Sequence, residues 1–131
     1  MINALLLLNS GWVLLFTRLV LGSVMLHFGW PKIKSLKSNS KDFVKMGLKP
    51  GILWGTIVAI VEFAGGAMMV LGIFAEFAAI LFGIEMIGGA IWKITKTDKP
   101  FSDWSYDLVL LSMCLVIIAF GAGFYAFLPL F

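Results

Sequence analysis

Residues 51–92 of this chain are GILWGTIVAIVEFAGGAMMVLGIFAEFAAILFGIEMIGGAIW, two apolar segments joined by a short turn near Gly72. Each half is long enough to cross a bilayer, because a transmembrane helix needs about 20 mainly apolar residues. The turn between them is too short to span a membrane, so the two helices must run antiparallel. This segment therefore predicts a membrane-spanning helical hairpin.

Two further apolar segments flank the hairpin. The chain has 131 residues, of which 61% are hydrophobic and 13% are charged, whereas soluble domains carry about 25% charged residues. We predict an all-α fold, a four-transmembrane-helix bundle that forms a single domain over residues 1–131. Pro31 is expected to end the first span, because proline lacks the backbone donor that continues a helix. The predicted spans cover about residues 5–30, 52–71, 74–94 and 104–128.

The lysines are concentrated in two of the connecting segments. Cytoplasmic loops of membrane proteins carry an excess of Lys and Arg. We therefore expect both lysine-rich segments to lie in the cytoplasm and both termini to be extracytoplasmic. Segment 31–50 contains Lys32, Lys34, Lys37, Lys41, Lys45 and Lys49, and the segment after the third span contains Lys93, Lys96 and Lys99.

The basic segment 31–50 allows three interpretations. Its lysines alternate with apolar residues, so it can lie in the headgroup layer and favour anionic lipids. It can also be a solvated loop that only sets the topology, or a docking site for a cytoplasmic redox partner. The expected partners are thus the lipid bilayer, a cytoplasmic protein and a second copy of the chain, and nothing in the sequence indicates nucleic-acid binding.

Several ionisable or reactive side chains lie within the predicted spans. A charge at the bilayer centre costs at least ~2.5–3.5 kcal/mol on insertion scales, and such residues usually face the bundle interior and serve a function. Counting from the predicted helix ends puts most of them in one layer near the membrane midplane. His27 lies closer to a helix end, and it either faces elsewhere or joins a separate cluster with Tyr106 or Asp107. The candidate ligand-binding residues are Arg18, His27, Glu62, Glu85 and Cys114.

Two carboxylates that face one arginine cannot both be ionised cheaply in a dry layer. We predict that Glu62 pairs with Arg18 and that Glu85 holds a proton. Both glutamates are then candidate catalytic proton donors or acceptors. An Arg18–Glu62 pair that only fixes the helix register is the alternative, and Glu76, at the outer turn, is expected to be exposed.

Small residues lie beside these charged residues along the spans. Close backbone approach through small residues is a common way for membrane helices to pack. We therefore expect helix packing at Gly22, Gly29, Gly65, Gly66, Gly88 and Gly89.

Four short motifs occur in order along the chain: Arg18-Leu-Val-Leu-Gly22, His27-Phe-Gly29-Trp-Pro-Lys32, Val61-Glu62-Phe-Ala-Gly65-Gly66 and Trp104-Ser-Tyr106-Asp107. In these motifs the chain resembles the DoxX family of small integral membrane proteins. The resemblance implies a multi-pass, four-helix protein of the prokaryotic cytoplasmic membrane. Relatives include membrane subunits of thiosulfate:quinone oxidoreductase. The resemblance marks Arg18, Gly22, Gly29, Lys32, Glu62, Gly65 and Gly66 as the shared pattern.

Residue chemistry limits the reactions that this chain can perform. A single histidine cannot provide bis-histidine haem ligation, a single cysteine cannot act as a dithiol, and the sequence contains no metal-binding motif. A site for a quinone headgroup remains, in which Arg18 bonds a carbonyl and Glu62 or Glu85 supplies a proton. We predict a redox-linked membrane subunit with a quinone-like or small-molecule ligand, as part of an oxidoreductase. The alternatives are a small carrier or proton-linked permease, and a non-catalytic membrane scaffold for cytoplasmic partners.

Overall fold

The computed structural model describes residues 2–45, 47 and 50–123, with side chains from residue 11 onwards. These residues form five α-helices, of which α1, α3, α4 and α5 are long and apolar enough to cross a membrane. The prediction of an all-α fold with four apolar spans is confirmed, and the chain is a multi-pass membrane protein. The helices are α1 (Ile2–Lys34), α2 (Leu36–Lys45), α3 (Gly51–Leu71), α4 (Ala75–Lys96) and α5 (Phe101–Phe120).

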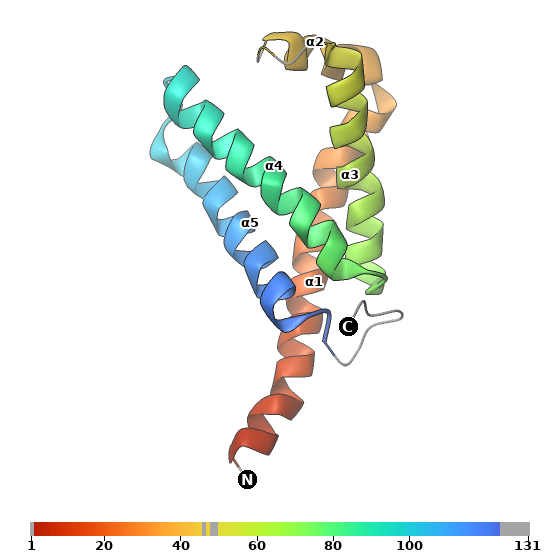
Figure 1. The fold of residues 1–131 in the computed structure, drawn as a ribbon, viewed down its shortest axis with the longest axis vertical. Helices are drawn as coiled ribbons and strands as arrows, with labels where there is room; N and C mark the ends of the chain where they lie inside the picture. The colour runs from red at the N-terminus through yellow and green to blue at the C-terminus, as the bar shows by residue number, and fades with distance from the viewer. Residues whose placement is uncertain (1, 46, 48–49, 124–131) are drawn as a thin grey trace.

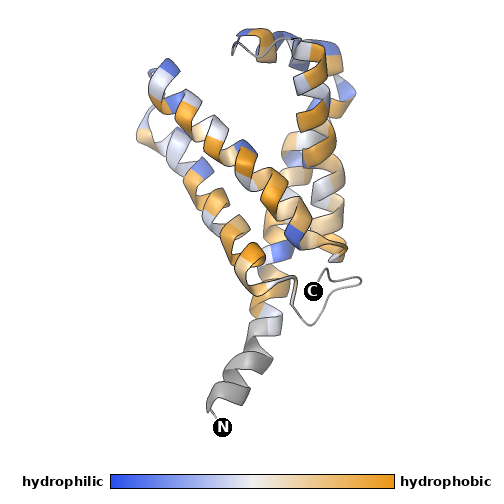
Figure 2. Ribbon diagram, viewed as in Figure 1, coloured by the Kyte–Doolittle hydropathy of each residue, from blue (hydrophilic) through white to orange (hydrophobic). Residues whose placement is uncertain are grey.

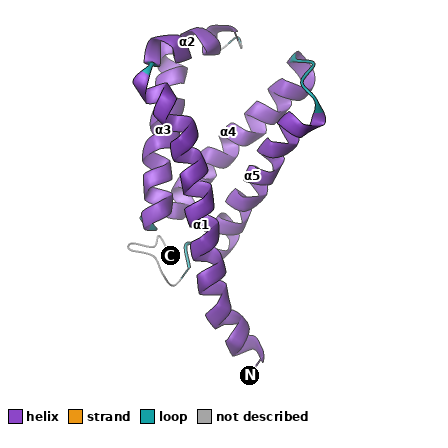
Figure 3. Cartoon of the chain, turned by 180° about the vertical axis from the view of Figure 1, so that it is seen from behind, coloured by secondary structure: helices purple, strands orange, loops and turns teal. Residues whose placement is uncertain are grey.

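The four long helices form two pairs that diverge like the arms of a V (Figure 1). α1 packs mainly on α3, and α4 packs mainly on α5. Figure 3 shows the same two arms from behind, with α2 lying across the end of the α1–α3 arm. We call the open end of the V, which carries α2 and the α4–α5 connection, the lysine-rich end. The arms meet at the opposite end, which we call the closed end.

Hydropathy follows this arrangement. Apolar residues dominate the four long helices, and hydrophilic residues are concentrated at the lysine-rich end, with isolated ones farther down (Figure 2). Many large apolar side chains are exposed along all four helices. A soluble protein of this size would bury such surface, whereas lipid tails solvate it in a membrane.

Glycines bring α1 and α3 into close contact. A Cβ atom at Gly22 would lie 2.9 Å from the carbonyl oxygen of Gly66, and one at Gly66 would lie 3.0 Å from that of Gly22. A Cβ atom at Gly29 would lie 2.6 Å from the backbone nitrogen of Phe63. The structure thus places these three glycines at the contact of α1 and α3, and a Cβ atom at Gly65 would lie 3.1 Å from Met25. The contacts also set the register of α1 along α3.

The closed end is held by a tight turn and a continuous apolar core. Gly72 ends α3 with φ 76°, and its N–H donates to the carbonyl of Met68 at 2.8 Å. Because α4 begins three residues later, the α3–α4 hairpin is fixed at this point. The core around it is contributed by all four long helices and includes Leu21, Met25, Met69, Phe82, Cys114 and Ile117.

Two predictions about the helices are corrected by the structure. Pro31 does not end the first span, because α1 continues for one further turn to Lys34 and the N–H of Ser35 then donates to the carbonyl of Pro31 at 3.1 Å. Within segment 31–50, residues 36–45 form the short helix α2. The last helix ends at Phe120 rather than near residue 128, because Gly121 adopts φ 81°. Residues 124–128 lie outside the described residues.

Gly88 makes no helix contact of the kind predicted, whereas Gly89 lies against Asp107 of α5. No atom lies within 4 Å of a Cβ atom built at Gly88, and the nearest atom to one at Gly89 is Oδ2 of Asp107, at 3.5 Å. Both glycines belong to the half of α4 that diverges from α3, and of the two only Gly88 faces open space.

Candidate functional site

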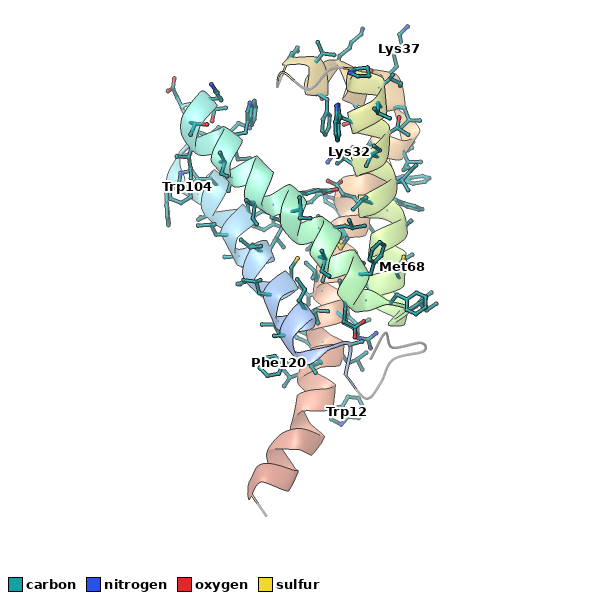
Figure 4. All side chains as sticks on the ribbon, in the orientation of Figure 1. Trp12, Lys32, Lys37, Met68, Trp104 and Phe120 are labelled. Carbon is teal, nitrogen blue, oxygen red and sulfur yellow. The ribbon has the colours of Figure 1, made fainter. Side chains whose placement is uncertain are left out.

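A cleft of about 860 Å³ opens between the two arms at the lysine-rich end. Every helix of the described chain contributes to its lining. Figure 4 labels Lys32 and Trp104 on opposite arms beside this opening. Four lysines, four acidic residues and four aromatic residues line the cleft, namely Lys32, Lys45, Lys93, Lys99, Asp42, Glu62, Glu85, Asp107, Phe28, Phe43, Trp92 and Tyr106.

An ion pair on the α1–α3 arm forms one wall of the cleft. Nζ of Lys32 lies 2.6 Å from Oε1 of Glu62, and the Glu62 side chain is only 4% exposed. The glycine contact at Gly29 brings α1 against the backbone of α3 at Glu62 and Phe63. Lys32 follows Gly29 by three residues and therefore lies on the same side of α1. Close packing of the two helices thus places the ammonium group beside the carboxylate.

A second ion pair forms the facing wall on the α4–α5 arm. Nζ of Lys93 lies 2.9 Å from Oδ2 of Asp107, whose side chain is 8% exposed. Gly89 lies one turn before Lys93 and leaves room for the Asp107 carboxylate. Sequence reasoning missed Lys93 and Asp107 as site residues. The available signal was that each lies just inside a predicted span end, on helices joined by a short connection.

Glu85 also lines the cleft, about two turns before Lys93 on α4, and it forms no ion pair with a lysine among the described residues. Both of its carboxylate oxygens are buried without a hydrogen bond among the described residues. The charged groups that act on it are Glu62 and Lys32 across the cleft. The carboxyl groups of Glu62 and Glu85 therefore interact, although their geometry does not complete a hydrogen bond. A buried carboxyl group without a partner is energetically costly and is typical of functional positions in membranes.

Arg18 does not belong to this cleft. It is 1% exposed at the closed end, where Nη1 donates to the carbonyl of Met69 at 3.4 Å. Glu76 is the acidic group whose charge acts on it. The predicted Arg18–Glu62 pair is therefore wrong. Because α1 runs past Pro31, Arg18 lies farther from the lysine-rich end than the predicted span implied, and the Gly22–Gly66 contact places it beside the end of α3.

Glu76 is buried rather than exposed as predicted, with 2% of the residue accessible. Its Oε1 atom accepts a hydrogen bond from the backbone N–H of Ala122 at 3.0 Å. This contact ties the start of α4 to the chain that follows α5. The turn position suggested exposure, but the approach of Arg18 and Ala122 gives this carboxylate partners inside the protein.

His27 and Cys114 also lie away from the cleft lining. His27 is exposed on α1, and its ring lies 6.0 Å from that of its neighbour Phe28. Cys114 is fully buried in the apolar core beside Gly83. Of the predicted ligand-binding residues, the structure brings together Glu62 and Glu85, buries Cys114 within range of the Glu85 charge, and places Arg18 and His27 elsewhere. In the described part of the chain, no group of three or more His, Cys, Asp or Glu residues is arranged to hold a metal ion.

These features define a class: a small, all-helical, multi-pass membrane protein with a charged and aromatic cleft open at one end. The sequence profile named DoxX matches residues 13–95, which is more than half of the chain. This protein belongs to the DoxX family, as its motifs indicated.

One curated relative matches along most of its length. It is a protein of Bacillus subtilis (strain 168) named "Putative oxidoreductase CatD", and it is 25% identical over 118 residues. The match covers 88% of this chain and 84% of the relative. No solved structure matches the chain.

Proposed function

We propose that this protein is a redox-linked membrane subunit that binds a quinone-like molecule in the cleft. The observation that carries the proposal is that Glu85 lines the same cleft as two lysine–carboxylate pairs, one on each arm. The name of the Bacillus relative, an oxidoreductase, supports the redox assignment. We further propose that the lysine-rich end faces the cytoplasm of a prokaryotic cell, because cytoplasmic segments carry the excess of lysine.

The cleft residues fit the chemistry of a quinone headgroup. A headgroup of this kind is a flat ring with a carbonyl oxygen on either side. A lysine ammonium has three donors, so Lys32 and Lys93 can each hold a carboxylate and still donate to a ligand oxygen. The apolar rings of Phe28 and Trp92 line the same cleft and offer surfaces for a flat ring.

The residues then divide into binding and proton-transfer roles. Lys32 and Lys93 bind and orient the two ligand oxygens. Glu85, which has no lysine partner, holds the proton that is transferred, and Glu62 lies beside it to receive or replace that proton. A bound quinone supplies the redox chemistry by accepting two electrons and two protons. The electrons come from a partner protein or a bound reductant.

A small carrier or proton-linked permease is the second candidate. The cleft opens at the lysine-rich end, whereas the closed end is packed by the core and by the Glu76–Ala122 hydrogen bond. A carrier open to one side of the membrane has this arrangement, and Glu85 would then couple substrate movement to a proton.

The first experiment is to identify what the purified protein retains. We expect mass spectrometry of organic extracts to find a quinone at near-stoichiometric amounts in the parent protein. We expect the Lys93→Gln variant to lose it. Lys96→Gln is the matched control, because Lys96 is exposed on the same helix and does not line the cleft.

Two results would count against a quinone site. One is a parent protein that retains no quinone and does not bind added ubiquinone or menaquinone. The other is retention by a correctly folded Lys93→Gln protein at the parent level. Proton-coupled uptake into liposomes, lost in Glu85→Gln, would instead favour the carrier.

A further inference from the structure

The exposed lysines of α2 form a single stripe. Lys37, Lys41 and Lys45 recur every four residues and are all exposed, so they lie along one side of the helix about 6 Å apart. Lys34, at the end of α1, precedes the stripe by one turn. Asp42 is the one acidic residue of α2. The helix therefore presents a basic surface with a net positive charge.

The opposite side of α2 is fixed to α3. The amide of Asn39 donates to the carbonyl of Gly55 at 2.8 Å, and Asn39 is buried. A Cβ atom at Gly51 would overlap the carbonyl oxygen of Ser40, so α2 approaches α3 more closely than a side chain there would allow. The lysine stripe is thus held in one orientation and is not part of a freely moving loop.

Tryptophans place α2 at the depth of the lipid headgroups. Trp54 is 43% exposed and directly precedes Gly55, to which α2 is bonded. Trp30 is 51% exposed, and Nζ of Lys34 lies 5.6 Å from the centre of its ring. Exposed tryptophans of membrane proteins are enriched at the membrane–water interface. An amphipathic basic helix at this depth lies within the negative potential of an anionic membrane surface.

We propose that α2 and the end of α1 form a binding surface for anionic phospholipids, with Lys34, Lys37, Lys41 and Lys45 contacting headgroup phosphates. Among the three interpretations of the basic segment, charge complementarity and headgroup depth favour this one. A loop that only set the topology would not need a helix bonded to α3 by a buried amide. Of these four lysines only Lys45 also lines the cleft, and the proposal does not depend on the function proposed for the cleft.

The test uses the full chain in an uncharged detergent, titrated with dioctanoyl phosphatidylglycerol and followed by native mass spectrometry. Dioctanoyl phosphatidylcholine and inorganic phosphate are the comparison probes. We expect phosphatidylglycerol to bind more tightly than either. We expect K37Q/K41Q/K45Q to bind it about 100-fold more weakly, from ~1 kcal/mol per lysine near the surface. K37R/K41R/K45R keeps the charge and should bind within a few-fold of the parent.

Several results would overturn the proposal. They are an unchanged phosphatidylglycerol affinity in the glutamine variant, equal binding of phosphatidylcholine by the parent, and equal binding of inorganic phosphate. An unchanged affinity in the glutamine variant would instead favour a soluble acidic protein as the partner of the lysine stripe. If the glutamine variant does not fold, the salt dependence of lipid binding by the parent protein tests the proposal. Its affinity for phosphatidylglycerol must fall as salt rises from about 0.1 to 1 M, since the screening length shortens from about 10 Å to 3 Å.

Discussion

At the scale of single residues, the ion pair between Lys32 and Glu62 defines one wall of the cleft. The Glu62 carboxylate is nearly inaccessible, whereas the Lys32 side chain is 30% exposed. Burying two charges costs more than their attraction returns, but removing one partner leaves the other uncompensated. The pair therefore constrains which substitutions the α1–α3 arm tolerates.

Lys32→Met is expected to lower the free energy of unfolding by about 1–3 kcal/mol. This is less than the 3–5 kcal/mol of a fully buried pair, because Lys32 is partly exposed. Adding Glu62→Gln should recover part of the loss, since no isolated charge then remains. Unfolding in sodium dodecyl sulfate, followed by circular dichroism, measures both effects. Equal instability of the double and single variants would mean that the two side chains are not coupled.

Glu76→Ala is expected to cost about 2–4 kcal/mol, because it leaves the buried Ala122 amide without its acceptor and removes the negative charge acting on Arg18. Asp98→Ala is the matched control, since Asp98 is exposed in the α4–α5 connection and surface substitutions usually change stability by less than about 0.5 kcal/mol. The same unfolding titration compares them. Similar stability of the two variants would show that Glu76 is dispensable at the closed end.

At the scale of helices, glycine has two different roles in this chain. Gly22, Gly29 and Gly66 permit the backbones of α1 and α3 to touch, whereas Gly88 borders the open cleft. The sequence alone does not separate these roles, because each glycine lies near a charged residue on an apolar helix. The two roles differ because α4 diverges from α3, so that Gly88 has no helix packed against it.

Gly29→Ala and Gly88→Ala form a matched pair that tests this distinction. Gly29→Ala should destabilise the protein by about 1–3 kcal/mol, because the new methyl group overlaps backbone atoms of Phe63. Gly88→Ala should be neutral or stabilising by up to about 1 kcal/mol, because alanine favours helix more than glycine does and nothing occupies the space. Thermal unfolding in bicelles ranks the variants. The reverse order would place α4 against α3 along its whole length.

The attachment of α2 depends on one buried amide. Asn39→Ala removes the hydrogen bond to Gly55 and leaves that carbonyl without the amide donor, at a cost of about 1–3 kcal/mol. We expect the amides of residues 36–45 to exchange hydrogen faster as the helix detaches. Hydrogen–deuterium exchange measures this, with Ser38→Ala as the control, since Ser38 is exposed on the same helix. Unchanged exchange in Asn39→Ala would show that α2 is held by other contacts.

At the scale of the whole molecule, the divergence of the two arms creates the cleft. The α3–α4 turn and the core hold the arms together at the closed end. At the lysine-rich end, residues 97–100 connect α4 to α5 within one arm and do not link it to the other arm. Ionic walls and open space between the arms imply that water enters from the lysine-rich end. This is a property of how the helices are arranged, since no single helix encloses the cleft.

A cysteine at Gly88 should therefore react with a membrane-impermeant maleimide from one side of the membrane. We expect Gly88→Cys to be labelled in inverted vesicles and protected in right-side-out vesicles, if the lysine-rich end is cytoplasmic. Ala64→Cys, exposed on α3 but outside the cleft lining, should be protected by lipid in both. The parent supplies the background, because Cys114 is fully buried. Labelling only in right-side-out vesicles would reverse the proposed orientation.

The sequence alone was enough to identify the four spans and the charged residues within them. Apolar runs of bilayer length and the cost of charge in lipid are local properties, so composition reveals both. The sequence also singled out the glycines at positions 22, 29 and 66, which lie where α1 meets α3, because small residues are the usual contact points of membrane helices.

Only the tertiary structure decided which charges meet. Lys32 rather than Arg18 pairs with Glu62, Arg18 lies near Glu76, and Asp107 pairs with Lys93. These partners depend on the axial register of one helix along another. The observed register differs from the predicted one because α1 continues through Pro31 for one more turn. In a helix whose faces are all apolar, the sequence pattern marks neither the inward face nor the register. Both are set by contacts between residues far apart in the chain, such as Gly22 with Gly66.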